Sequence, residues 1–119
     1  MSLIFSDNLD FDSTPPKAYV DQDIEVTLDD YENIQETYSW LVEKPDGSVF
    51  SDSYFDNRET FSFKPVDLGF KEGRYKIEIR FDEDENSFRI PIFEIFDIVE
   101  RVDDGEVKVT RTFAPFISE

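Results

Sequence analysis

The sequence predicts an all-β fold in which antiparallel strands form a sandwich of two sheets. Apolar and polar residues alternate along most of the chain, as they do in strands with one buried face. Polar turns separate seven or more short segments at spacings of roughly ten residues, which is typical of a sandwich. Aromatic residues make up 16% of the 119 residues, with 13 Phe, so a core can form without cysteine.

The first two core strands are expected where the alternation is clearest. In residues 24–28 (IEVTL) and 38–42 (YSWLV) every second residue is apolar, so each segment has one apolar face. Residues 44–48 (KPDGS) are expected to form a turn, because proline presets φ and glycine tolerates a positive φ. We expect this turn to close a hairpin onto Val49 and Phe50.

Two further strands are expected in the middle of the chain. Residues 59–64 (ETFSFK) place two phenylalanines on one side, and residues 74–81 (RYKIEIRF) alternate without interruption. The acidic segment 82–87 (DEDENS) is expected to turn the chain back. The helical candidate, residues 29–37, is short enough to be one helical turn or a plain loop.

The last part of the chain carries a break in its pattern. In residues 88–98 the alternation slips by one position between Ile92 and Phe93, which predicts a β-bulge or a strand that changes sheets. Residues 103–105 (DDG) are a hairpin signal. Residues 107–113 are then expected to form a final strand.

We expect a single domain with an extension at each end, because 119 residues support one core. Residues 1–14 are expected to be an edge strand or a linker, and residues 15–99 the sandwich. Residues 100–119 are expected to add a C-terminal strand or to start a linker to a next domain. The opening Met-Ser-Leu resembles a cloning leader, so we expect a piece of a larger protein. The expected core is Ile24, Val26, Trp40, Phe61, Phe63, Tyr75, Ile77, Ile79 and Ile90.

Composition excludes several classes of function. The chain has no His and no Cys, which removes the commonest general base, thiol nucleophiles and the usual transition-metal ligands. Paired carboxylates alone carry little information among 29 acidic residues, so we do not expect an enzyme. A net charge of −17 disfavours nucleic acid as a partner, and direct membrane insertion is not expected without a long apolar run.

Several short motifs together resemble a known family. Trp40 lies in the middle of an expected strand, and Tyr75 follows Gly73 at the start of another. The order Tyr-Ser-Trp, Pro-Asp-Gly, Phe-Ser-Phe and Gly-x-Tyr-x-Ile is similar to immunoglobulin-like sandwich domains, in particular the PKD-like branch found in microbial surface proteins. The resemblance covers about residues 16–98. It implies an immunoglobulin-like fold, an extracellular or cell-surface location, and a non-catalytic structural or adhesive role.

The same resemblance gives Tyr75 a structural role. In immunoglobulin-like domains a tyrosine at the start of this strand bonds to the backbone a few residues upstream. A buried tyrosine ring also needs a partner for its hydroxyl group. We therefore expect the Tyr75 hydroxyl to reach the backbone near Asp67 or Leu68.

An alternative function is a binding module that uses loops at one end of the sandwich. For Ca²⁺, the candidate ligands are Asp82, Glu83, Asp84 and Glu85, joined by Asp29 and Asp30 if the fold brings those loops together. The sequence Asp-x-Asp-x-Asn begins like an EF-hand loop, but Ser87 and Phe93 replace the Gly and Glu that the loop requires. A hydrated hairpin tip that deters aggregation explains the same acidic residues.

For a glycan, the candidate ligands are the aromatic rings that alternation does not account for: Tyr19, Tyr31, Tyr54 and Phe55. Single exposed aromatic residues are also normal on protein surfaces. The expected partners are neighbouring domains of the same chain, other proteins or a glycan. Residues 1–14 and 106–113 are the segments expected to pair with a neighbouring chain through a sheet edge. A structural piece of a virion or appendage remains a third reading of the same features.

Overall fold

The computed structural model describes residues 1–81 and 92–101, and within them the fold is all-β. Eight strands and three single-turn 3₁₀ helices account for the regular structure of these residues. The strands are β1 (Leu3–Phe5), β2 (Lys17–Tyr19), β3 (Ile24–Leu28), β4 (Tyr38–Glu43), β5 (Val49–Ser51), β6 (Thr60–Phe63), β7 (Gly73–Phe81) and β8 (Ile92–Val99). The 3₁₀ helices are η1 (Tyr31–Asn33), η2 (Ser53–Phe55) and η3 (Pro65–Leu68). The all-β fold class is confirmed.

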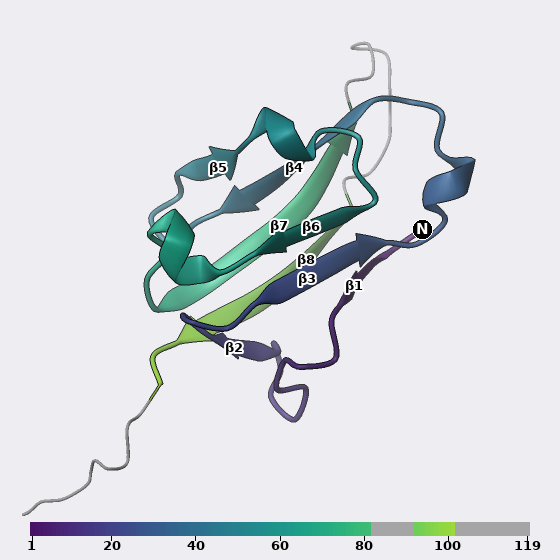
Figure 1. Cartoon of the computed structure of the whole chain (residues 1–119). Helices are drawn as coiled ribbons and strands as arrows, with labels where there is room; N and C mark the ends of the chain where they lie inside the picture. Colours follow the sequence, from purple (N-terminus) through teal and green to yellow (C-terminus); the bar gives the residue numbers. More distant parts are fainter. Residues whose placement is uncertain (82–91, 102–119) are drawn as a thin grey trace, which may run out of the picture.

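The strands form two sheets (Figure 1). The smaller sheet has the order β1-β3-β6, and the larger has the order β2-β8-β7-β4-β5. All pairs are antiparallel except β2 with β8, which run parallel. The prediction of purely antiparallel sheets is therefore wrong at this one pair. Alternation reports which residues are buried and carries no information on strand direction, so the sequence could not reveal this pair.

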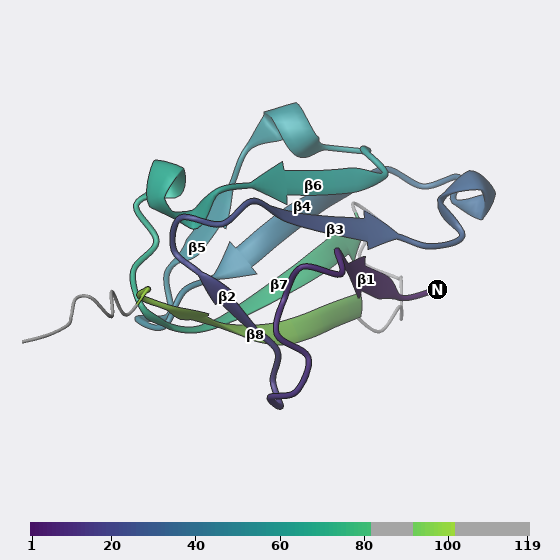
Figure 2. The same ribbon diagram turned by 60° about the horizontal axis from the view of Figure 1, so that its bottom comes forward.

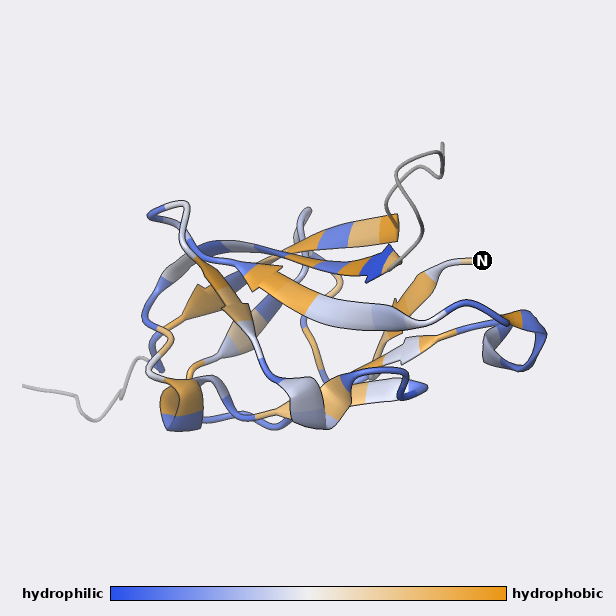
Figure 3. Cartoon of the chain, turned by 90° about the horizontal axis from the view of Figure 1, so that it is seen from above, coloured by the Kyte–Doolittle hydropathy of each residue, from blue (hydrophilic) through white to orange (hydrophobic). Residues whose placement is uncertain are grey.

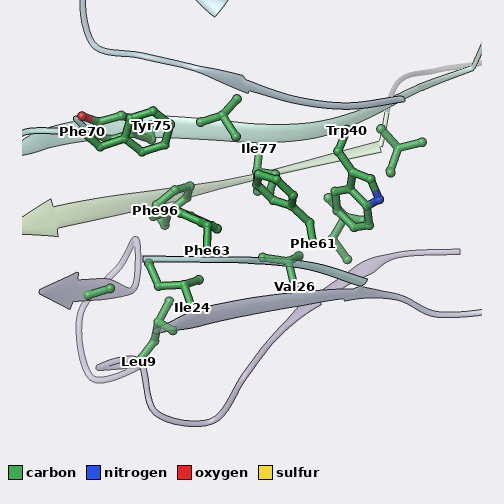
Figure 4. Packing of buried hydrophobic residues seen from close by; sticks show 14 of the residues in the cluster. Leu9, Ile24, Val26, Trp40, Phe61, Phe63, Phe70, Tyr75, Ile77 and Phe96 are labelled. Carbon is green, nitrogen blue, oxygen red and sulfur yellow. The ribbon is translucent and has the colours of Figure 1, made fainter. Parts of the chain in front are cut away.

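The core lies between the two sheets, whose inward side chains meet as Figure 4 shows. Of the predicted core, all eight members within the described residues are buried, and Ile90 lies outside them. Aromatic rings run through the interior in contact with one another. Trp40 stacks on Phe61 with ring centroids 5.7 Å apart, and Tyr75 stacks on Phe96 at the same distance. Hydrophobic and hydrophilic residues succeed one another along the strands (Figure 3).

The predicted hairpin between β4 and β5 is confirmed. The Lys44 amide donates to the Ser48 carbonyl over 2.8 Å, and the Gly47 amide donates to the Lys44 carbonyl over 2.9 Å. Gly47 has a φ of +88°, which glycine adopts without steric cost. The Asp46 carboxylate accepts hydrogen bonds from the amide and the hydroxyl of Ser48, which holds the turn.

The bulge predicted near Ile92 is absent from the described part of β8, so that prediction is wrong. The pairing of β7 with β8 runs in unbroken register from Gly73 opposite Ile98 to Ile79 opposite Ile92. The alternation slips because β8 has apolar residues on both faces. Phe96 and Ile98 point into the core, and Phe93 lies on the outward face.

The Tyr75 hydroxyl bonds to the backbone upstream, as expected, but to a different residue. It donates to the Lys71 carbonyl over 2.6 Å, and not to Asp67 or Leu68. Asp67 and Leu68 lie within η3, which is capped by Gly69 with a φ of +74°. The chain then runs directly from Lys71 into β7.

The two ends of the described chain lie at opposite ends of the sheets (Figures 1 and 2). Leu3 pairs with Leu28 at the end of β3, whereas Val99 pairs with Tyr19 at the other end of the fold. The segment between β1 and β2 crosses from the smaller sheet to the larger. Among the described residues, no helix is long and apolar enough to cross a membrane.

Candidate functional site

Three of the four predicted aromatic ligands lie around one short segment, Asn57–Arg58. Tyr31 in η1 donates its hydroxyl to the Asn57 carbonyl over 3.3 Å. The Arg58 guanidinium carbon lies 4.2 Å from the ring centroid of Tyr54 in η2. Phe55 packs edge-on against the core ring of Phe61, with centroids 4.5 Å apart. We call Tyr31, Tyr54, Phe55 and Arg58 the Tyr54 cluster.

Local hydrogen bonds explain why the chain folds this way before β6. The Asp52 carboxylate accepts from the Tyr54 amide over 2.9 Å and caps η2. Asn57 has a φ of +63°, a left-handed conformation that asparagine tolerates better than most residues. Its side-chain oxygen accepts from the Tyr38 amide over 2.8 Å, and its own amide donates to the Tyr38 carbonyl over 3.0 Å.

The backbone of Arg58 joins the cluster to the core. Its carbonyl oxygen accepts two hydrogen bonds, from the Tyr38 hydroxyl over 2.6 Å and from the Trp40 indole nitrogen over 2.9 Å. Both donors are buried side chains of β4. Burial raises the pKa of Tyr38 to about 12, so its hydroxyl stays protonated and donating at neutral pH. The segment that carries the cluster is thus held by two core aromatic residues.

The chemistry of the cluster suits contact with a planar or amphipathic surface. Tyr54 is 63% exposed, which is the largest exposure among the large hydrophobic and aromatic residues of the described chain. The Arg58 side chain donates from Nε to the Tyr54 carbonyl and lies over the ring. Tyrosine and arginine are the residue types most enriched at binding hot spots. Sequence reasoning missed Arg58, although its spacing of four from Tyr54 was visible.

Tyr19 does not join the Tyr54 cluster. It lies in β2 at the opposite end of the sandwich from η1 (Figure 1), with its side chain 40% exposed. The Arg101 guanidinium carbon is 4.1 Å from its ring centroid, and Arg101 also pairs with Asp21 over 2.9 Å. Two tyrosines of the described chain, Tyr19 and Tyr54, therefore each lie against an arginine, and they do so in separate parts of the fold.

The predicted Ca²⁺ ligands Asp82, Glu83, Asp84 and Glu85 lie outside the described residues. Asp29 and Asp30 lie next to the amino group of Met1, at 4.0 and 3.9 Å. Hydrogen bonds from the backbone and hydroxyl of Ser2 lower the pKa of Asp29. In residues 1–81 and 92–101, no three Asp or Glu side chains are grouped so that they could hold a metal ion.

A polar hollow of about 570 Å³ lies at the end of the smaller sheet that is near η3. Hydrogen bonds fix one wall, because Ser6 and Asn8 bond to the backbone of Glu25 and Asp23. Sequence reasoning missed this hollow because its walls come from segments that are far apart in the chain. Its charged and polar lining is Ser6, Asp7, Asn8, Asp23, Glu25, Ser62, Lys64 and Asp67.

Comparison of the chain with protein-family models, with curated proteins and with solved structures finds no match in any of the three.

Proposed function

We propose that this chain is a non-catalytic, immunoglobulin-like module that spaces, presents or attaches other parts of a larger protein. The observation that carries the proposal is the order of the strands. The orders β1-β3-β6 and β2-β8-β7-β4-β5 support it, because β3 and β6 can be matched to strands B and E, and β4, β7 and β8 to strands C, F and G. β5 takes the place of strand C′ beside C. In this match, β1 in the smaller sheet and β2 in the larger sheet are the two halves of the first strand, strand A.

Two side chains support the same assignment. Trp40 is buried on β4, where immunoglobulin domains place a core tryptophan on strand C. Tyr75 stands at the start of β7 and bonds back to the Lys71 carbonyl, as the corner tyrosine of strand F does. The PKD-like branch and a cell-surface location are parts of this proposal that depend on the sequence motifs.

The positions of Leu3 and Val99, near the two ends of the described fold, support a spacing role. Leu3 and Val99 lie at opposite ends of the sheets, so modules joined through these ends would extend in series. Tension applied at the two ends pulls β1 along β3 and pulls β8 along β2 and β7. The hydrogen bonds of these pairs then share the load, because they lie across the direction of pulling. The proposed partners are the neighbouring domains of the same chain.

Single-molecule stretching of several chains joined in series tests this role. A load-bearing module gives discrete unfolding events, each releasing roughly 300 Å as residues 3–99 extend. The matched control attaches the handles at Leu3 and at Ser62, so that the load no longer passes through β8. The control should unfold at a lower force. Gradual extension without discrete events in the end-to-end arrangement would contradict the spacing role.

The exposed ring of Tyr54 favours glycan binding as a second candidate function. Its ring is 63% exposed and held by Arg58, and sugars commonly stack on such aromatic faces. A glycan titration followed by tyrosine fluorescence should respond in the wild type and not in Tyr54→Ala. Tyr19→Ala is the matched control, because Tyr19 also lies against an arginine but in β2, outside the Tyr54 cluster. No binding across a broad glycan array would reject this candidate.

A further inference from the structure

The outward face of the larger sheet carries apolar residues in positions that water-facing strands usually fill with polar ones. The β7–β8 register places Phe93 opposite Glu78 and Ile95 opposite Lys76, so all four lie on this face. Phe93 is 48% exposed, and the Lys76 ammonium group lies 5.2 Å from its ring centroid. The break in the sequence pattern at Ile92 therefore marks a surface feature and not a bulge.

One row of residues crosses four strands of this face, next to the turn between β4 and β5. The pairings are Val49 with Glu43, Glu43 with Lys76, and Lys76 with Ile95. The Lys76 Nζ atom lies 3.4 Å from the Glu43 Oε1 atom. We call these four residues the central row. Read across the sheet, the row is apolar, acidic, basic and apolar.

The charges of this face nearly cancel, although the whole chain carries a net charge of −17. Arg74 pairs with Asp97 over 2.8 Å, and Arg80 pairs with Glu78 over 3.1 Å. With Lys17, which pairs with Asp97 across β2 and β8, and with Lys76 and Glu43, the described strands of this face hold four basic and three acidic side chains. Two copies of so acidic a chain repel one another over most of their surfaces. They can approach closely where the local charge cancels.

We propose that this face binds the same face of a second copy of the chain. The two-fold axis lies between the two copies, runs parallel to the strands and passes over the line between β4 and β7. Rotation about this axis places Val49 opposite Ile95 of the second copy, and Glu43 opposite Lys76 of the second copy. The central row is its own complement, as a symmetric interface requires. Within this row, apolar side chains meet apolar ones, and the acid meets a base. A dissimilar partner would not require this palindromic order.

Charge reversal within the central row tests the proposal. Sedimentation velocity at about 0.15 M salt should show a concentration-dependent dimer for the wild type. Lys76→Glu places acids opposite acids in a symmetric dimer, and Glu43→Lys places bases opposite bases. For each variant alone, the dissociation constant of the dimer should rise by roughly a hundredfold or more. An equal mixture of the two variants should form a heterodimer, because every acid again faces a base.

The mixing result separates the interface from internal effects of the substitutions. Loss of the internal Lys76–Glu43 ion pair cannot be repaired by adding a second chain, whereas an interface pair can. Circular dichroism of each variant establishes that it is folded. A wild type that stays monomeric up to its highest soluble concentration would overturn the proposal and leave the face to a different protein. Failure of the mixture to associate would also overturn it.

A matched pair of apolar substitutions tests where the interface lies. Val49 and Ile4 are exposed to nearly the same extent, 53% and 52%, on edge strands of different sheets. Val49→Ser should weaken the dimer about tenfold, whereas Ile4→Ser should leave it unchanged. Equal effects of the two substitutions, or an effect of Ile4→Ser alone, would overturn the assignment to this face.

Discussion

The hydroxyl of Tyr75 donates a 2.6 Å hydrogen bond to the backbone carbonyl of Lys71, four residues earlier. The ring is buried, so Tyr75→Phe leaves the carbonyl without this donor. We expect the free energy of unfolding to fall by about 1 to 2 kcal/mol, measured by urea denaturation. Tyr19→Phe is the control, since the Tyr19 hydroxyl makes no hydrogen bond to the described residues. An unchanged midpoint for Tyr75→Phe would contradict the role of this bond.

Tyr38 should make the protein lose stability in alkali. Burial raises its pKa to about 12 in the folded state, above the ordinary value of about 10 in the unfolded chain. Its contribution is therefore complete below pH 10 and is lost as the pH rises from about 10 to about 12. Denaturation at a series of pH values should show this decline.

Tyr38→Phe should flatten the decline, because phenylalanine does not ionise. Burial also raises the pKa of Tyr75, so part of the slope should persist in the variant. The quantity to compare is the difference in the free energy of unfolding between the wild type and Tyr38→Phe at each pH. If this difference stayed constant across the alkaline range, the assignment of the slope to Tyr38 would be wrong.

Gly73 should tolerate no side chain. Its φ is +152°, and a Cβ atom built there would lie 2.6 Å from the Cγ atom of Pro45. We expect Gly73→Ala to destabilise the protein by about 1 to 3 kcal/mol through this overlap and the strained backbone. Adding Pro45→Ala should recover part of the loss by removing the overlapping atom. Strictly additive effects in this double-mutant cycle would argue against the contact.

Asn57 should be more sensitive to alanine than to glycine. Both substitutions remove the side-chain oxygen that accepts from the Tyr38 amide. Only glycine adopts the φ of +63° without steric cost. We therefore expect Asn57→Ala to cost roughly 1 kcal/mol more than Asn57→Gly in thermal or urea unfolding. The reverse order would show that the backbone conformation at this position does not limit stability.

The sequence predicted the core strands well because a period of two is directly visible in residues. Trp40 and Ile77 lie at the centre of alternating segments, and both are fully buried. The same reasoning failed where a strand is apolar on both faces. For Phe93 it assigned the extra apolar residue to an irregular backbone, since a single sequence does not distinguish a bulge from an exposed ring.

The candidate site was predicted in part. Tyr54 was selected because alternation left its ring unexplained, and the structure exposes it. The role of Arg58 depends on a folded loop whose shape is set by Asn57 and by donors from β4. Such long-range hydrogen bonds leave no periodic trace. For the same reason the separation of Tyr19 from the other three rings could not be predicted from the residues alone.

The parallel pair of β2 and β8 has a consequence for how the protein is made. Lys17 pairs with Asp97, so a ribosome must synthesise eighty further residues before this pair can form. β2 leaves the ribosome early, and its partner β8 is synthesised only near the end of the described chain. Contacts between such distant residues slow folding, because the long loop must lose conformational entropy before the contact can stabilise the fold. Until then a nascent chain leaves the backbone edge of β2 without its partner strand, and unpaired strand edges of this kind favour aggregation.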